Sequence, residues 1–274
     1  MTRPAQVAPL ARERAHTLYF LDGIRAISPV FLDTEVDMSA VLAHRAEARA
    51  EQVRYSVVTY VLHEAARVLV RHPEANVAIA RGRWRSRLAR YDGAHGKLTL
   101  DRTLGGQRVV LSAVLPDLDS ADLDTIQSRI DYYRDGDPEV MPEFAGVRTL
   151  HRLPRPVGAF AFRRRVGGLG ARAAILGTFA VTSLGHRPVD GFHSVGGTTI
   201  TLGVGRIAER PTVQEGRIVA APLMRLNLAF DHRAIDGALA ADVLAEIKEA
   251  LEHFGLDAPR PHARAAEAGL VAEQ

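Results

Sequence analysis

The chain has 274 residues, of which 47% are hydrophobic and 24% charged, the balance of an ordinary globular protein. Because it contains no cysteine, disulfides, thiolate zinc sites and a cysteine nucleophile are excluded. Its apolar runs are short, and its first residues lack the continuous apolar core of a signal peptide, so we expect a cytoplasmic protein without a transmembrane helix.

The formal net charge is only +3, but nearly all the basic residues are arginines, with dense patches at 81–90 and 163–165. Such patches could bind the phosphates of a nucleotide-bearing cofactor or nucleic acid, or could be a solvated face or a subunit contact. The first patch carries Trp84 but no series of aromatic side chains for stacking bases. We therefore expect neither a nucleic-acid partner nor a membrane partner.

In the first half of the chain, residues 1–11 are expected to form a flexible arm. Hydrophobic periodicity then predicts strands over 30–36 and 107–115 and helices over 55–71 and 120–133. The first helix should end near His72-Pro73, because proline disfavours helix in the residue before it. The second should be capped by Asp119 or Ser120 and end at Asp135-Gly136.

Residues 135–158 are rich in proline, glycine and charge, which indicates a surface connector. Beyond it, strands are predicted over 177–181, 198–204, 217–219 and 223–230. The clearest helix covers 238–254 and stops at Gly255. The pattern predicts one α+β domain over 12–255, with a flexible polar tail over 256–274.

One motif stands out, the run DHRAIDG over 231–237, which follows the last predicted strand and opens the last helix. His232 lies at the end of the strand, and Asp236 follows four residues later beside a glycine that permits a tight backbone. An imidazole held rigid at the edge of a cleft is what general base catalysis requires. A histidine beside Asp and Arg is more often structural, so the surrounding sequence decides between the two interpretations.

The C-terminal third resembles the catalytic domain of the dihydrolipoyl acyltransferases of 2-oxo acid dehydrogenase complexes. That family belongs with chloramphenicol acetyltransferase among the CoA-dependent acyltransferases. The likeness covers most of 12–255, with weaker echoes at 34–38 and 71–76, and is carried by GTFAVTSLG at 177–185, by 202–219 and by 226–252. It implies a chloramphenicol acetyltransferase-like layered sheet with helices, assembled as a trimer.

The resemblance also implies catalytic roles for three residues. His232 matches the family's general base, which takes the proton of the group that attacks an acyl thioester. Thr182 matches the hydroxyl residue that donates to the tetrahedral oxyanion, typically worth about 3 kcal/mol of transition-state stabilisation. Asp236 matches an aspartate that holds the local backbone through an ion pair, for which Arg12 and Arg14 are candidate partners.

Two alternatives remain open around these residues. Ser183 would replace Thr182 if the match were displaced by one position. His186 and His193, in the glycine-rich loop that follows, either line the acceptor pocket or are ordinary exposed loop histidines.

The family builds its active sites between subunits, so a homotrimer is expected, with Thr182 and His232 of one chain far apart. Coenzyme A or acyl-CoA would be the co-substrate and no metal is implied, while the arginines that bind the nucleotide phosphates stay unassigned. The only lysines are Lys97 and Lys248, and neither fits a lipoyl lysine. The loop 187–199, the stretch 101–116 and the polar tail depart from the family.

From these features the chain is expected to be a stand-alone acyltransferase. It would move an acyl group from CoA, or from a carrier-bound thioester, to a small-molecule acceptor. One alternative is a catalytically silent trimeric scaffold or binding homologue. Another is an acyltransferase that acts on a separate lipoyl domain of a 2-oxo acid dehydrogenase complex.

Overall fold

The computed structural model describes residues 5, 7–80, 82 and 84–255. The predicted tail over 256–274 and part of the predicted arm, residues 1–4 and 6, lie outside the described residues. Residues 7–11 contain no helix or strand, and regular structure begins at a short 3₁₀ helix, η1 (Arg12–Arg14).

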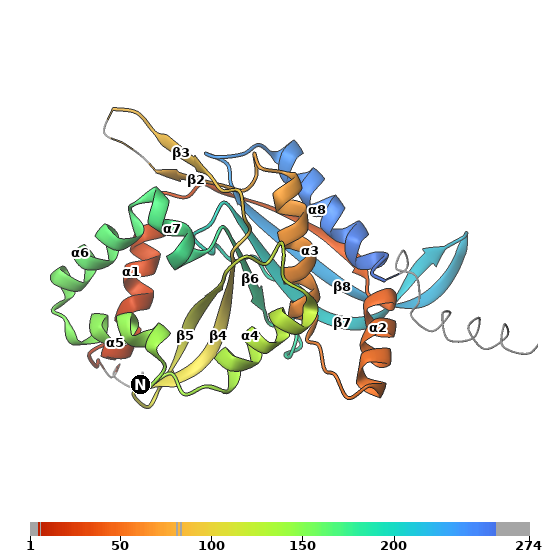
Figure 1. The fold of residues 1–274 in the computed structure, drawn as a ribbon, viewed down its shortest axis with the longest axis horizontal. Coiled ribbons are helices and arrows are strands. Elements are labelled where there is room, and N and C mark those ends of the chain that lie inside the picture. Colours follow the sequence, from red (N-terminus) through yellow and green to blue (C-terminus); the bar gives the residue numbers. More distant parts are fainter. Residues whose placement is uncertain (1–4, 6, 81, 83, 256–274) are drawn as a thin grey trace, which may run out of the picture.

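The centre of the fold is a mixed six-stranded sheet with the order β1-β8-β7-β6-β4-β5 (Figure 1). The pairs β7–β6 and β6–β4 are parallel, and the other neighbours are antiparallel. Its strands are β1 (Pro29–Asp37), β4 (Gly96–Leu104), β5 (Gln107–Leu115), β6 (Phe179–Ser183), β7 (Ile200–Gln214) and β8 (Arg217–Asp231). A separate two-stranded hairpin is formed by β2 (Val77–Ala80) and β3 (Arg87–Arg90).

Two tight turns set the register of the long hairpins. Glu215 and Gly216 both have positive φ, 49° and 75°, between the paired ends of β7 and β8. Gly105 and Gly106, with φ of 58° and 75°, connect β4 to β5 in the same way. A two-residue loop with φ positive at both positions matches the right-handed twist of the strands it joins. The β7–β8 hairpin consequently extends as a long arm beyond the rest of the sheet (Figure 1).

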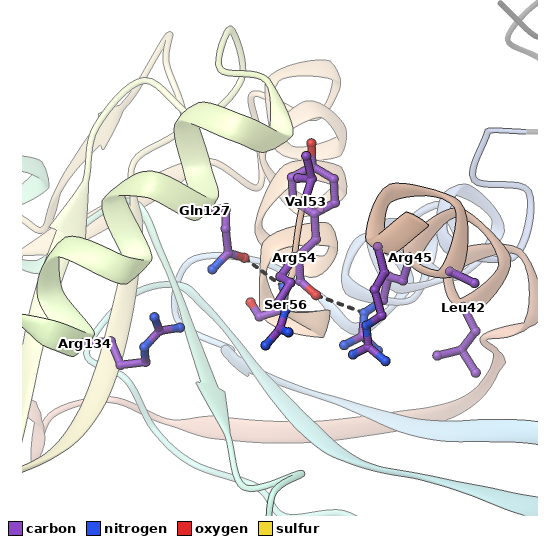
Figure 2. A pocket seen from close by; sticks show the side chains of 10 residues that line it. Leu42, Arg45, Val53, Arg54, Ser56, Gln127 and Arg134 are labelled. Carbon is purple, nitrogen blue, oxygen red and sulfur yellow. Dashed lines mark hydrogen bonds between the residues drawn. The ribbon is translucent and has the colours of Figure 1, made fainter. Parts of the chain in front are cut away.

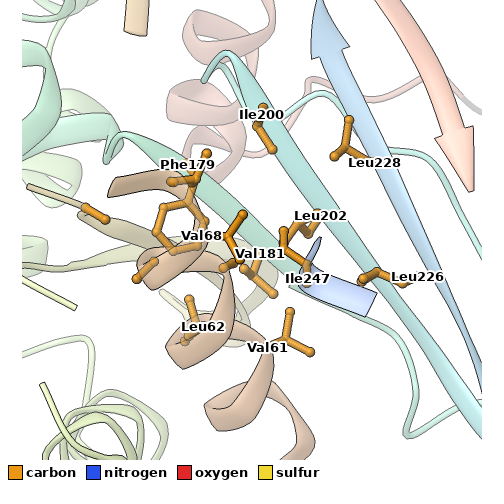
Figure 3. Close-up of a cluster of buried hydrophobic side chains, with 14 of the residues drawn as sticks. Val61, Leu62, Val68, Phe179, Val181, Ile200, Leu202, Leu226, Leu228 and Ile247 are labelled. Carbon is orange, nitrogen blue, oxygen red and sulfur yellow. The ribbon is translucent and has the colours of Figure 1, made fainter. Parts of the chain in front are cut away.

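One face of the sheet is covered by helices whose apolar sides form the main core (Figures 1 and 3). The central helix α3 begins after Ser56, whose hydroxyl accepts from the Thr59 backbone N–H and caps the helix. Its buried stripe, which includes Val61, Leu62 and Val68, packs against Phe179 and Val181 of β6. The covering helices are α2 (Ser39–Ala50), α3 (Val57–Arg71), α4 (Leu123–Asp135) and α8 (Gly237–Glu252).

A second group of helices lies beside β4 and β5 (Figure 1). It contains η2 (Pro142–Phe144) together with α1 (Ala15–Ile24), α5 (Ala145–Arg152), α6 (Arg155–Val166) and α7 (Leu169–Leu176). The surface connector predicted over 135–158 is therefore wrong. Pro142 and Pro156 stand in the first turns of η2 and α6, where no intrahelical N–H bond is lost. Gly158 lets α6 approach Tyr19 of α1 closely.

Most other predicted elements are present with shifted ends. The predicted strands 217–219 and 223–230 are one strand, β8, because Pro222 lies within its pairing with β7. The helix expected over 120–133 begins at Leu123, and its cap is Asp122 rather than Asp119 or Ser120. Within the described residues, no helix combines the length and the apolar character needed to span a bilayer.

The corrected cap of α4 can be tested by substitution. Asp122 accepts the Thr125 backbone N–H at 2.8 Å, and hydrogen bonds from Thr125 lower the pKa of this carboxyl. A lowered pKa gives stability that is present above the ordinary carboxyl value and is lost as the pH falls through the folded-state pKa. We expect Asp122→Ala to lower the melting temperature at neutral pH, with the difference from wild type closing in acid. Ser120→Ala should leave the melting temperature unchanged, and an equal loss in both variants would contradict this assignment.

Candidate active site

His232 stands at the end of β8, where the chain turns toward α8. Its backbone N–H donates to the Ser28 carbonyl at 2.9 Å, and its ring lies 5.5 Å from the Phe230 ring, centroid to centroid. The side chain is 48% exposed, and Nδ1 lies 3.5 Å from a carboxylate oxygen of Asp236. The imidazole is thus fixed at its base and open to solvent at the rim of the sheet.

The backbone around His232 is held by its neighbour Asp231, which the sequence analysis did not single out. This carboxylate is only 4% exposed, and it accepts two bonds from the Arg233 guanidinium at 2.6 and 2.8 Å and one from the Ser28 N–H at 3.3 Å. Burial alone would raise the pKa of Asp231, but the bonds from Arg233 outweigh burial and hold the pKa below its ordinary value. In the sequence, the only sign of this role is that Asp231 is a charged residue at the end of an apolar strand.

Asp236 occupies a different setting from the one expected. Its carboxylate is 90% exposed, and among the described residues its ion pair is with His232 itself, not with Arg12 or Arg14. Those two arginines belong to η1, which contacts β5 near the β4–β5 turn, whereas Asp236 precedes α8. The buried ion pair that fixes this backbone is therefore made by Asp231.

Thr182 and Ser183 point to opposite faces of β6, because side chains alternate along a strand. Val181, and with it Ser183, faces the core beneath α3, whereas Ala180 and Thr182 face the other side, where Gly196 approaches Ala180. Ser183 bonds back locally, accepting the Gly185 N–H at 3.3 Å. The register thus separates the two candidates and leaves Thr182 on the face without the α3 and α8 cover.

The structure does not bring Thr182 and His232 of one chain together. Phe179 and Phe230 lie level with one another across Ile200 of β7. Along the strand direction, Thr182 lies three residues from Phe179, and His232 lies two residues from Phe230 in the opposite direction. Across the sheet, β7 lies between their two strands. At the usual rise per residue and distance between strands, about 20 Å separates Thr182 from His232. This separation agrees with the expectation for two residues that meet only across a subunit boundary.

The loop after Thr182 crosses the same face of the sheet. The Phe192 carbonyl lies against Gly203 of β7, and the His193 ring lies 5.2 Å from the Phe31 ring of β1, centroid to centroid. His186 and His193 are both exposed. The structure places neither histidine in an enclosed pocket.

An arginine-lined cavity of about 330 Å³ lies between α2, the start of α3 and α4 (Figure 2). Arg45 is held in it by a 2.9 Å bond from Nε to the Tyr55 carbonyl, and Gln127 accepts the Ser56 N–H at 2.8 Å. Its arginines are Arg45, Arg49, Arg54 and Arg134. Guanidinium groups bind phosphates and carboxylates, so this cavity is a candidate site for an anionic group. Separately, no three potential metal-ligating side chains gather in the described part of the chain.

Both lysines are engaged in contacts, Lys97 inside the fold and Lys248 at the surface. Lys97 is almost fully buried, donates to the Gly196 carbonyl and lies 4.7 Å from the centre of the Phe20 ring. Burial, followed by the nearby Arg172 charge, lowers the pKa of Lys97 to about 7. Lys248 donates to Glu252 and to the Glu35 carbonyl. Neither side chain stands free in the way a lipoyl-bearing lysine must.

Residues 152–256 match the sequence model of the family described as 2-oxoacid dehydrogenases acyltransferase (catalytic domain). This segment belongs to that acyltransferase family. The chain is also 33% identical over 119 residues to the dihydrolipoyllysine-residue acetyltransferase component of the pyruvate dehydrogenase complex of Staphylococcus aureus. The match covers 40% of this chain but 26% of the relative, so it spans about a quarter of that protein's length.

Solved structures of related acyltransferases share the whole fold. A dihydrolipoamide acetyltransferase from Azotobacter vinelandii superposes with a TM-score of 0.66 and 20% identity, covering 91% of this chain and 92% of that one. The cubic core of a pyruvate dehydrogenase multienzyme complex gives the same values. The layered acyltransferase fold expected from the sequence is confirmed, and it includes residues well before the segment matched by the family.

Substitution can test whether Asp231 or Asp236 holds the backbone around His232. Asp231→Asn removes the buried charge that pairs with the partly exposed Arg233. Breaking such a pair should lower the free energy of unfolding by about 2–3 kcal/mol. Asp236→Asn, at an exposed position, should leave stability unchanged. Urea denaturation of both variants measures the difference, and a larger loss in Asp236→Asn would reverse the assignment.

Proposed function

We propose that this chain transfers acyl groups between CoA and the thiol of a dihydrolipoyl group. The observation that carries the proposal is a fixed, half-exposed His232, positioned by a buried ion pair within the segment that matches the acyltransferase family. The curated relatives are named dihydrolipoyllysine-residue acetyltransferases, which supports this acceptor. The dihydrolipoyl group therefore replaces, as the proposed acceptor, the small molecule expected from the sequence. A catalytically silent scaffold is not favoured.

The chemistry requires a base for the attacking thiol and a donor for the oxyanion. Asp236 beside Nδ1 favours the tautomer with the proton on that nitrogen, leaving Nε2 of His232 free to accept the thiol proton. The thiolate attacks the thioester carbonyl, and the Thr182 hydroxyl donates to the oxygen that becomes negative. When the tetrahedral intermediate collapses, the C–S bond to the leaving thiol breaks and that sulfur takes the proton from the imidazolium.

These roles fit the Azotobacter enzyme, whose structure comes from an investigation of a serine, a histidine and an asparagine in its catalytic mechanism. The asparagine there stands four positions after the histidine, the spacing between His232 and Asp236. Thr182 would supply the hydroxyl that the serine supplies in that protein. This chain has an aspartate at the position of that asparagine.

A homotrimer would join the separated halves of the site, with His232 from one protomer and Thr182 from the next. The β7–β8 arm supports self-association, because Val213 and Ile218, paired at its tip, are both largely exposed. The multimeric core among the comparison structures supports the same arrangement.

The arginine-lined cavity would bind the phosphates of CoA. It lies at the first turn of α3, and the last turn of α3 leads toward β2 at the other end of the sheet (Figure 1). The cavity is therefore at the Thr182 end of the sheet but on the helix-covered face. A donor bound there would have to extend past the end of β6 to reach the Thr182 hydroxyl on the opposite face. Arg134 already pairs with Asp131 and Asp135, which leaves Arg49 and Arg54 as the guanidinium groups best able to take phosphate.

A site built by two protomers predicts complementation between inactive variants. His232→Ala and Thr182→Ala should each lower transfer from acetyl-CoA to dihydrolipoamide, by at least about a hundredfold for the threonine. Unfolding and refolding an equal mixture of the two should restore activity, because about a quarter of the sites in randomly mixed cyclic trimers receive both native residues.

Ser183→Ala is the matched control for the threonine and should keep wild-type turnover. No recovery on mixing would contradict the shared site. Activity of His232→Ala equal to wild type would end the acyltransfer proposal. Wild-type turnover of hydroxyl or amine acceptors in place of dihydrolipoamide would instead restore the small-molecule acceptor.

The phosphate role of the cavity predicts a KM effect. Arg54→Gln should raise the KM for acetyl-CoA about tenfold through loss of a charge-assisted phosphate contact, with little change in kcat. Steady-state kinetics at constant salt measures it. Arg108→Gln, on the β4–β5 hairpin and paired with Asp101, is the control and should not change this KM. A lower kcat at unchanged KM in Arg54→Gln would place the phosphates elsewhere.

A further inference from the structure

The β2–β3 hairpin carries a concentration of positive charge that the proposed chemistry does not use. The stretch 77–90 contains five arginines and no acidic residue. Of these, Arg85, Arg87 and Arg90 are described; all three are exposed, and within the described residues none of them makes an ion pair with a carboxylate. On the β4–β5 hairpin and on β7, by contrast, Arg108 and Arg206 each pair with an aspartate.

This hairpin is anchored rigidly at its base. The Asn76 side-chain amide donates to the carbonyls of Tyr91 and Gly93 at 2.9 and 3.0 Å, which closes the two strands. The Tyr91 hydroxyl donates to the Leu169 carbonyl at 2.9 Å, and Arg172 donates to the Ile79 carbonyl at 3.1 Å. The hairpin is therefore tied to α7, and its exposed part projects from the body of the fold (Figure 1).

The anchored base lies at the His232 end of the sheet. The Thr199 hydroxyl donates to the Val77 carbonyl of β2, and the Thr199 carbonyl accepts the N–H of Asp231, the residue before His232. One residue, Thr199, thus joins the hairpin to the strand end that presents the imidazole. An acceptor that reaches His232 passes the rim from which the arginines project.

We propose that this hairpin is the docking surface for an acidic protein domain that carries the dihydrolipoyl acceptor to His232. The inference rests on the proposed function and adds the class of partner. An unbalanced cluster of positive charge at the entrance of a site raises the local concentration of an oppositely charged partner and speeds its association. A free dihydrolipoamide molecule is uncharged, so it gains nothing from the arginines, and the carrier must supply the negative surface.

The charge is better suited to a folded acidic domain than to nucleic acid. Trp84 is the only aromatic side chain between Val77 and Arg90, and single-strand binding surfaces combine arginines with several stacking rings. The hairpin also projects beside a site for acyl chemistry rather than along a continuous basic groove.

The test compares one acceptor in two forms, free dihydrolipoamide and a reduced, acidic lipoylated carrier domain. The double variant Arg87→Glu/Arg90→Glu should raise the KM for the carrier domain about tenfold at low salt, with the difference shrinking as salt rises. The KM for free dihydrolipoamide should stay at the wild-type value. The matched control, Arg164→Glu/Arg165→Glu on α6, makes the same change in net charge and should alter neither KM.

Several results would overturn the docking surface. One is an equal rise in the KM for the carrier domain in both double variants. Another is an equal rise in the KM for both acceptors in the hairpin variant. A third is loss of the oligomer when the hairpin variant is analysed by size-exclusion chromatography. Tighter binding of a single-stranded oligonucleotide than of the carrier domain would assign the hairpin to nucleic acid. Failure of the wild type to use either acceptor would defeat the proposed function, and calorimetric titration of the carrier domain would still show whether the hairpin binds it.

Discussion

The buried ion pair between Asp231 and Arg233 is the interaction on which the candidate site depends. It closes the end of β8. The Asp231 backbone N–H donates to the carbonyl of Thr199, just before β7, and its carboxylate accepts from the N–H of Ser28, just before β1. Three segments that are distant in sequence are thereby fixed around one carboxylate. His232 follows immediately, so its backbone has little freedom, although its ring is half-exposed. Removing one charge from such a pair leaves the other partly desolvated and without its partner, which costs stability.

The same sheet that fixes His232 also separates it from Thr182. Thr182 lies on β6 toward one end of the sheet, and His232 follows β8 at the opposite end, with β7 between the two strands. The hydrogen bonds between the strands fix this separation within one chain. A hydroxyl and an imidazole placed this way can act on one thioester only if another copy of the chain supplies the missing half. Under the proposed function, assembly is thus a requirement of the chemistry and not merely a source of stability.

Sequence patterns predicted the parts of this fold in which local periodicity and burial agree. The strand 107–115 was predicted with its observed ends, and the helix 55–71 was misplaced by only two residues. The helices over 145–166 were missed, because their prolines and Gly158 indicate a loop until the contact with Tyr19 is known. The DHRAIDG motif located His232, but the choice between Asp231 and Asp236 depends on burial, which appears only when β1, β7 and β8 pair. The arginine-lined cavity is formed by α2, α3 and α4, and no single stretch of sequence shows it.

The identity of the basic residues fits the chemistry proposed for this site. Of 35 lysines and arginines, only Lys97 and Lys248 are lysines. Lys97 is buried, and Lys248 is held at the surface by Glu252. A lysine amine that loses its proton is a nucleophile and can attack an acyl thioester, whereas a guanidinium stays protonated and still binds carboxylates and phosphates. Arginine therefore gives the cavity and the hairpin positive charge without a group that competes for the acyl chain. Burial lowers the pKa of Lys97 to about 7, and the same burial, against the Phe20 ring, keeps its amine from any thioester bound at the rim.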